Sequence, residues 1–262
     1  MVIEPQVRTV PPIANAERVL VPRLLSTQSS IDVGWHTHQE GLLYAVFHGL
    51  ASIQTETGTC TMMPGQVGWL PPSTRHCGHS FGKAEALFLY LRPDVCHMMP
   101  DTPRVLSMSP LSKAIIDRLG TQTPPLSPHR VEQLLGVLVE EIREAGAMEL
   151  YLPMPREPRL LKIAAALQSN PDDNTDLDGW ARSLGMTRRT LMRRFQQETG
   201  LTIGQWRQQL RLLKAVQLLA EGHSVTSAAL AVGYSSLSAF IASFRQRFGV
   251  TPAKYFDRSE AG

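Results

Sequence analysis

The sequence predicts an α+β chain of two domains. The first is an N-terminal antiparallel β jelly roll followed by helices, and the second is an all-α domain with two helix-turn-helix motifs joined by a long helix. Over roughly the first hundred residues, short runs rich in β-branched and aromatic residues are broken by Gly and Pro. In the last hundred or so, apolar residues recur three and four apart, the period of a helix. One helix-turn-helix pattern occurs there twice, about fifty residues apart, and 262 residues suffice for two cores.

The composition of the sequence indicates the cellular compartment in which the protein is expected. No apolar run reaches the length of a membrane span, and the N-terminal residues lack the apolar core of a signal peptide. We therefore expect a soluble, cytoplasmic protein with no membrane partner. The three cysteines, Cys60, Cys77 and Cys96, are odd in number and form no CxxC pair. Buried reduced thiols are expected, and a redox switch is the alternative if two of them lie within bonding distance.

The net charge of +3 is unevenly distributed along the chain. Residues 1–155 hold 11 basic and 14 acidic residues, a net charge of −3, whereas residues 156–262 hold 15 and 9, a net charge of +6. Only the C-terminal part therefore has the excess of positive charge that attracts a polyanion.

Residues 1–105 are expected to hold the β-sheet. Strands are predicted at residues 42–49, 51–57, 60–63, 66–72 and 86–91. Turns are predicted at Gly49, Gly58, Pro64-Gly65 and Pro71-Pro72. Evenly spaced strands without intervening helices indicate an antiparallel sandwich or barrel.

Three histidines in this part are candidates for chemistry. His36 and His38 are two residues apart, so on a strand both would point to one face of the sheet. His76 ends the stretch PGQVGWLPPSTRH, after a Pro-bounded strand and a turn. With this HxH and this later His, the region resembles the cupin fold, a small jelly roll whose metal-using members coordinate a divalent ion through such residues and a Glu. Three imidazoles suit a first-row transition metal.

Two departures from the cupin pattern leave the role of these histidines open. Glu40 follows His38 by only two residues, closer than the family's Glu follows its second His. The Gly of the family's second motif is absent from Pro72-Ser73-Thr74. Three interpretations remain: His36, His38 and His76 bind a divalent transition metal, they line a pocket for an organic effector, or they are structural.

The middle of the chain is expected to connect the two domains. Residues 106–150 form a helical segment, with helices predicted at 110–120 and about 130–145. The second has a broad apolar stripe opposite its glutamates, so these helices either pack on the jelly roll or pair two subunits. Prolines at 153, 155 and 158 stiffen residues 151–158 into an extended interdomain linker.

The C-terminal domain, residues 159–262, begins with a helix at 160–170 and is organised around LDGWARSLGMTRRTLMRRFQQET, residues 177–199. A short helix precedes the turn at Gly185, and Thr187 can cap a second helix whose inner face holds Leu191 and Phe195. The second helix also carries Arg188, Arg189, Arg193 and Arg194. An arginine-rich second helix is suited to a DNA major groove, and an ordinary helical hairpin with a solvated basic face is the alternative.

A second copy of the pattern, residues 224–249, favours the DNA-reading interpretation. It has a turn at Gly233-Tyr234, a cap at Ser236, and Phe240 and Phe244 four apart. The helix between the copies, residues 206–222, has one continuous apolar face. A rigid spacer of this kind lets two recognition helices enter successive major grooves, about 34 Å apart.

Residues 159–256 resemble the AraC/XylS family of transcriptional regulators. The resemblance rests on landmarks at family intervals: Leu177, Ala181, Leu184, Gly185, Leu191, Arg193, Phe195, Gly200, Ala229, Gly233, Tyr234, Phe240, Phe244, Phe248, Gly249, Thr251, Pro252 and Tyr255. The whole layout is similar to the subgroup with an N-terminal cupin sensor. The resemblance implies a sequence-specific activator or repressor whose partners are a double-stranded DNA operator, a small-molecule effector, RNA polymerase and a second copy of the chain.

The family pattern also indicates which side chains contact DNA. In the first recognition helix these are Arg189, Met192 and Arg193, with Arg188 and Thr190 at the groove edge. Arginine can bond guanine bidentately, for about 1–3 kcal/mol of discrimination, and Arg193 is the leading candidate. Arg194 is interpreted as a phosphate contact or a solvated side chain.

In the second recognition helix the equivalent positions are Leu237, Ser238, Ile241 and Ala242. None of these donates strongly to guanine, so this half is expected to add affinity and a modest preference for A·T pairs. The two halves of the DNA reader are therefore predicted to be unequal.

The sequence thus predicts a ligand-responsive transcription factor and not an enzyme. The competing prediction is a metal-dependent cupin enzyme with a DNA-binding tail, which the three histidines alone favour. Nothing else in the jelly roll supplies a general acid and base at motif spacing, so no catalytic residue is assigned.

Overall fold

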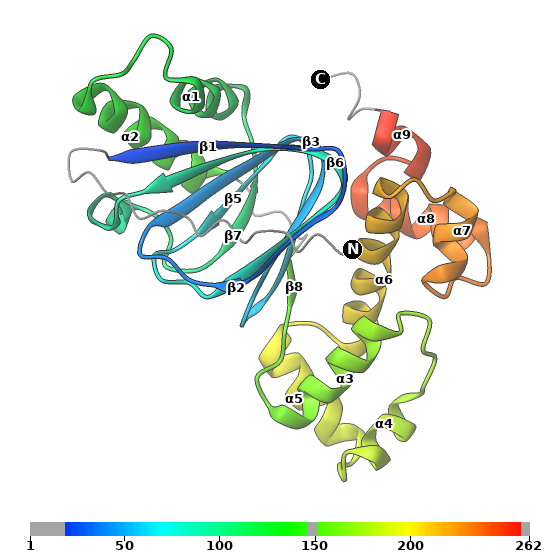
Figure 1. The fold of residues 1–262 in the computed structure, drawn as a ribbon. Coiled ribbons are helices and arrows are strands. Elements are labelled where there is room, and N and C mark those ends of the chain that lie inside the picture. The colour runs from blue at the N-terminus through cyan, green and yellow to red at the C-terminus, as the bar shows by residue number, and fades with distance from the viewer. Residues whose placement is uncertain (1–18, 146–150, 258–262) are drawn as a thin grey trace, which may run out of the picture. The chain divides into compact units, whose positions relative to one another are not determined.

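The computed structural model describes residues 19–145 and 151–257 (Figure 1). The chain divides into two compact units. The first comprises the residues up to Thr55 and Cys60–Tyr151, and the second comprises Glu56–Thr59 and the residues from Leu152 onward. No helix in the described ranges has the length and apolar character needed to cross a membrane.

An antiparallel sheet forms most of the first unit, and of its last strand only Tyr151 belongs to that unit. Its strands are β1 (Leu20–Thr27), β2 (Ile31–His36), β3 (Gly41–Thr55), β4 (Gly58–Met62), β5 (Gln66–Leu70), β6 (His76–Leu91), β7 (Arg104–Ser107) and β8 (Tyr151–Pro153). The main order is β1-β6-β3-β4-β8, β2 also pairs with β6, and β5 pairs with both β3 and β7. β6 and β3 are therefore the long central strands on which the others assemble.

One predicted turn is wrong. Strands were expected at 42–49 and 51–57 with a turn at Gly49, but β3 runs without interruption from Gly41 to Thr55. The register against β6 shifts around His48, and Gly49 has φ +76. A Cβ at Gly49 would lie 2.2 Å from the Lys83 carbonyl oxygen, so the glycine serves a bulge that brings two long strands together.

The central part of the sheet, in β3, β5 and β6, is buried on both faces. On one face Leu43, Trp69 and Leu89 belong to a core that includes helices α1 (Pro110–Thr121) and α2 (Pro128–Glu144). On the other face Leu42, Tyr44 and Val46 belong to a second core. Adjacent residues in the first half of β3 enter different cores, which explains why Leu42–Phe47 is apolar without alternating polar residues. A short 3₁₀ helix, η1 (Pro93–Met98), follows β6.

The cysteines contribute to this packing without disulfides. All three are free; Cys60 and Cys96 are buried, whereas Cys77 is partly exposed. The expectation of buried thiols therefore holds for two of the three.

The second unit is helical. Its helices are α3 (Pro158–Ser169), α4 (Leu177–Ser183), α5 (Arg188–Thr199), α6 (Ile203–Ala220), α7 (Val225–Ala231), α8 (Leu237–Phe248) and α9 (Pro252–Asp257). The predicted caps at Thr187 and Ser236 are confirmed, because each side chain accepts a hydrogen bond from the backbone N–H three residues later. The fold class predicted from the sequence, a sheet unit followed by a helix-turn-helix unit, is confirmed.

The two helix-turn-helix copies are alike in detail. Glycines with positive φ, Gly185 at +63 and Gly233 at +81, form the turns between α4 and α5 and between α7 and α8. Leu191 and Phe195 are buried on α5, as Phe240 and Phe244 are on α8. The long helix α6 buries Trp206, Leu210, Leu213 and Val216, and the Trp206 ring meets Phe195 edge-on at 5.8 Å between centroids.

Candidate metal cluster and nucleic-acid interface

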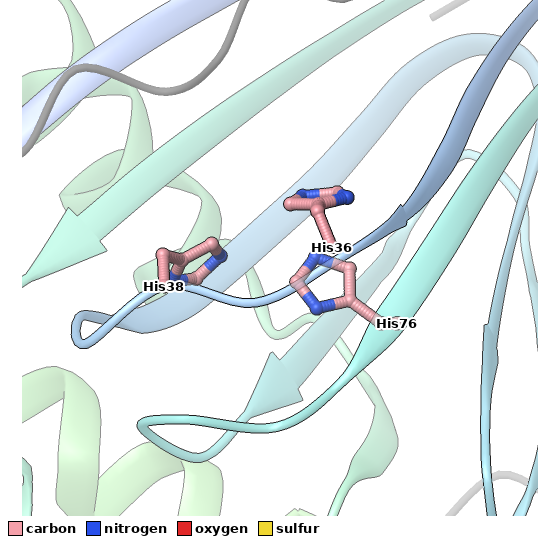
Figure 2. A group of neighbouring side chains, drawn as sticks. All are labelled: His36, His38 and His76. Carbon is pink, nitrogen blue, oxygen red and sulfur yellow. The ribbon is translucent and has the colours of Figure 1, made fainter.

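The three candidate histidines come together in the first unit. A ligand-capable atom from each of His36, His38 and His76 lies within 4.8 Å of the others. The ring centroids are 4.3 Å apart for His36 and His76, 5.1 Å for His38 and His76, and 5.9 Å for His36 and His38. Figure 2 shows the three rings gathered beside one another at the end of β2 and the start of β6.

The reason for this convergence differs from the predicted one. β2 ends at His36, and His38 lies beyond it, so the two side chains do not share the face of one strand. His36 instead pairs in register with His76 of β6. His38 joins them from the loop that leads to β3, where its Nδ1 lies 2.9 Å from the Glu40 carbonyl oxygen.

All three rings are held in the same way. Nδ1 lies 2.8 Å from the Gly34 carbonyl oxygen in His36, 2.9 Å from that of Glu40 in His38, and 2.9 Å from that of Thr74 in His76. A carbonyl can only accept, so each Nδ1 carries the proton and each Nε2 keeps its lone pair. This is how metal-binding histidines are oriented by a backbone carbonyl.

One of these lone pairs is unsatisfied within the protein. The Nε2 atom of His38 is buried and has no hydrogen-bond partner. A buried acceptor of this kind costs free energy unless something occupies the position in front of it. The His38 nitrogen is therefore an independent indication that the cluster accepts a ligand.

Two of the three histidines, His38 and His76, have a pKa below the usual value of an imidazole. Burial lowers the pKa of His76 to about 4, although its bond to the Thr74 carbonyl opposes the shift. Burial also lowers the pKa of His38, against the opposing effect of the Glu40 carbonyl. Neutral imidazole is the form that binds metals, so near pH 7 no proton has to be displaced from His38 or His76.

Glu40 lies behind the cluster. The residue is buried, and a carboxylate oxygen lies 3.8 Å from Nδ1 of His38, the ring nitrogen that does not carry the free lone pair. The Glu40 carboxylate is thus near the Nδ1 side of the His38 ring, opposite the Nε2 lone pair. It is not grouped with the three histidine nitrogens that could bind a metal. The three imidazoles by themselves fit a first-row transition metal.

Sequence reasoning missed the aromatic residues around the cluster. The Tyr90 ring meets the His38 ring edge-on at 5.3 Å, and Arg23 lies 5.9 Å from the Tyr90 centroid. Next to His36, Trp35 is 42% exposed, and the Arg75 guanidinium lies 4.9 Å from its ring centroid. Tyr90 belongs to β6 but lies far from His76 in sequence, so only the strand pairing brings it to this place.

The first candidate DNA-reading helix, α5, presents its predicted residues to solvent. Arg188, Arg189, Met192 and Arg193 are exposed, and Thr190 is half-buried, with its hydroxyl bonded to that of Thr187. Arg188 forms an ion pair with Asp178, and Arg193 bonds the Gln197 side chain at 3.4 Å. Arg189 and Arg193 lie on the face of α5 opposite Leu191 and Phe195, which are buried.

Arg194 has a different environment. Its Nη1 donates to both carboxylate oxygens of Glu157, at 2.9 Å each. One turn later on α5, Glu198 accepts from the backbone N–H groups of Arg156 and Glu157, at 2.6 and 3.0 Å. The indole N–H of Trp206 donates to the Pro153 carbonyl at 2.6 Å. Residues 153–157 are thus hydrogen-bonded to one side of the α5–α6 pair. Arg194 is part of this contact through its ion pair with Glu157.

The second candidate helix, α8, offers a mostly apolar surface. Leu237 is 40% exposed, Ser238 and Ala242 are exposed, and Ile241 is half-buried. The buried face is formed by Phe240 and Phe244. A sheet domain followed by paired helix-turn-helix motifs defines a class of protein, the DNA-binding transcriptional regulators with a ligand-binding domain.

Comparisons with known proteins identify the family. The AraC-like ligand binding domain matches residues 26–151, and a helix-turn-helix domain matches residues 180–258. The transcriptional regulator NimR of Escherichia coli (strain K12) is 32% identical over 227 residues, which cover 85% of this chain and 82% of NimR. The transcriptional activator RhaS of Escherichia coli (strain SE11) is 36% identical over 269 aligned positions, covering 92% of each chain. The crystal structure of ToxT from Vibrio cholerae O395 matches with a TM-score of 0.40 and 10% identity, over 91% of this chain and 97% of that one. The chain belongs to the AraC family of helix-turn-helix transcriptional regulators.

Proposed function

We propose that this regulator responds to a divalent first-row transition metal ion held by His36, His38 and His76. The observation that carries the proposal is that Nδ1 of every ring lies within 2.9 Å of a backbone carbonyl oxygen, from which we infer that every Nδ1 carries the proton. The cluster therefore offers an incoming ligand only lone pairs. A metal cation accepts lone pairs, whereas an organic effector would have to bring several donors to one small place.

A bound ion would place a divalent positive charge between the end of β2, the following loop and the start of β6. Such a crosslink restricts the loop that contains His38. Metal binding can change operator occupancy only if the DNA-binding and non-binding conformations differ in metal affinity. A metal-dependent enzyme is the less favoured function, because the sequence of the jelly roll supplies no general acid and base at motif spacing.

Metal analysis of purified full-length protein tests the proposal. We expect about one zinc, iron, manganese or nickel ion per chain, with the ion lost in His36→Ala and His76→Ala. His79→Ala is the matched control, because His79 is on the same strand as His76 but pairs with Asp32 outside the cluster. Protein that binds none of these ions at micromolar concentration would point to an organic effector or a structural role.

The DNA-contact assignments are part of the same proposal. Arg189, Met192 and Arg193 read bases from α5, with Arg188 and Thr190 at the groove edge, while Leu237, Ser238 and Ile241 contact the duplex from α8. Their exposure supports this role. The chain acts as a homodimer that meets RNA polymerase at its promoters, and the exposed Leu111 and Val137 on α1 and α2 support a subunit contact there.

A further inference from the structure

The DNA-binding unit has a first half, α3–α5, and a second half, α7–α9, which are joined by α6. Arg211, in the middle of α6, forms hydrogen bonds with both halves. Its Nε donates to the Pro171 carbonyl at 2.7 Å, and its Nη2 donates to the Asn174 side-chain oxygen at 3.0 Å. Pro171 and Asn174 lie in the loop between α3 and α4, in the first half. Its Nη1 donates to the Gly233 carbonyl at 3.3 Å, which is in the turn of the second helix-turn-helix. One half-buried guanidinium thus joins two segments that are about sixty residues apart in sequence.

The same two segments are in direct contact. A Cβ at Gly233 would lie 2.8 Å from the Asp172 Cα and 3.0 Å from Nη2 of Arg211. The equivalent glycine of the first motif, Gly185, would have nothing within 4 Å of such a Cβ. The second turn is therefore pressed against the loop of the first half, whereas the first turn has no corresponding neighbour.

We propose that Arg211 is a positioning residue that fixes the separation between the two recognition helices, α5 and α8. The proposal rests on the proposed reading of DNA by both helices. A single helix between two small subdomains leaves each of them free to pivot about its end. A planar, charged fork that bonds carbonyls on both sides removes this freedom, and guanidinium suits the task because its donors have a fixed geometry.

If the distance between the two recognition helices is fixed, the protein selects operators by the spacing between their two half-sites. Two rigidly connected helices fit half-sites at one separation, about one helical turn, or about 34 Å. One inserted base pair moves the second half-site by about 3.4 Å and rotates it by about 35° around the duplex. The bridged pair cannot follow this change. A pair that keeps α6 and the Gly233–Asp172 contact but lacks the Arg211 hydrogen bonds is less constrained and can follow it.

Arg207 provides a matched control. It lies one turn before Arg211 on the same face of α6 and bonds the same loop, through the carbonyls of Asp173 at 3.4 Å and Thr175 at 3.1 Å. Both its recorded acceptors belong to the first half. Arg207→Gln therefore removes one positive charge and bonds to the same loop while it leaves the bridge to Gly233 in place.

The test uses full-length protein and a duplex selected from random-sequence DNA by the wild-type chain, with its two half-sites located by footprinting. A second duplex carries one base pair inserted between them. Wild type and Arg207→Gln should bind the inserted duplex about tenfold more weakly or worse, comparable to the loss from one or two mismatches. Arg211→Gln should lose about threefold or less on insertion.

Each outcome decides the proposal. If Arg211→Gln loses as much affinity on insertion as wild type, Arg211 does not set the spacing. If wild type itself is indifferent to the insertion, the proposed two-helix reading fails first, and the spacing role fails with it. If Arg211→Gln does not fold, Arg211→Lys replaces it: Lys keeps the stem and the charge, but one ammonium cannot reach the Pro171 and Gly233 carbonyls together. Spacing tolerance in Arg211→Lys then supports the proposal, and wild-type selectivity overturns it.

Discussion

At the scale of single residues, a metal site needs both the right donor residues and a free lone pair on each of them. The sequence indicates the three donor histidines, but it does not show which ring nitrogen of each is free. The HxH pair and the later His identify the donors, yet only the carbonyls of Gly34, Glu40 and Thr74 determine which nitrogen of each ring is available. Backbone carbonyls have no signature in a sequence. The tautomer, on which the choice of metal over organic effector depends, therefore requires the structure.

The buried histidines predict how stability changes with pH. In the folded chain burial lowers the pKa of His76 to about 4, from 6.5. Between these values the unfolded chain binds more protons than the folded one, so the free energy of unfolding should fall as the pH drops from 6.5 to 4. Denaturant midpoints measured across this range, on protein treated with a chelator, should show the decline.

The variant His76→Phe isolates this contribution, because it keeps a buried ring that cannot take up a proton. Its midpoints should decline less between pH 6.5 and 4 than those of the wild type. His79→Gln, a substitution outside the cluster, is the control variant. A decline of the same size in all three proteins would mean that other groups cause it.

Arg193 carries the main prediction for DNA selectivity. Arg193→Ala should lose about 1–3 kcal/mol at the selected operator and relax the preference at one base pair, while Ala242→Ser should change little. Binding curves on the operator and on a scrambled duplex measure both effects. Equal losses on the two duplexes would instead make Arg193 a phosphate contact.

At the scale of elements, the two helix-turn-helix motifs share a pattern but not an environment. Both turns need glycine for a positive φ, and Asn is the residue that tolerates this conformation next best. Around Gly185 there is space for a side chain, whereas at Gly233 the backbone of Asp172 occupies it. The repeat that identifies the motifs in the sequence hides this difference.

This contrast predicts unequal effects of the same substitution. Gly185→Asn should cost about 1 kcal/mol, from backbone strain alone. Gly233→Asn should cost about 1–3 kcal/mol more, because the Asp172 loop must move. Thermal or denaturant unfolding of both variants measures the difference, and equal costs would show that the loop yields without resistance.

At the scale of the whole molecule, the excess of positive charge lies in the C-terminal part of the chain, where DNA is expected to bind. Residues 156–262 carry a net charge of +6 and residues 1–155 a net charge of −3. If the C-terminal unit neutralises six or more phosphates, operator affinity should fall about a thousandfold or more between 50 and 200 mM salt. A titration at four or five salt concentrations gives the slope, and a flat response would exclude phosphate contacts as the main source of affinity.

The sequence predictions are accurate where a feature depends on residues close together in the chain, and they fail where it depends on residues far apart. Helices and caps depend on residues three and four apart, so α5, α8 and the caps at Thr187 and Ser236 were found. The bulge at Gly49 depends on the carbonyl of Lys83 in the opposite strand, and it was mistaken for a turn. Arg211 was only one more basic residue in a helix, because its acceptors are carbonyls of loops far away in the chain.

The attachment of residues 153–157 to α5 and α6 has a practical consequence for dissecting the protein. A fragment that starts at Arg159 would leave the Trp206 indole without its acceptor, and Arg194 and Glu198 without the groups they bond. A fragment that starts at Leu152 would keep all of these contacts. An autonomous DNA-binding fragment should therefore begin within the stretch predicted as a linker, and truncation after it would yield a weaker fold and underestimate operator affinity.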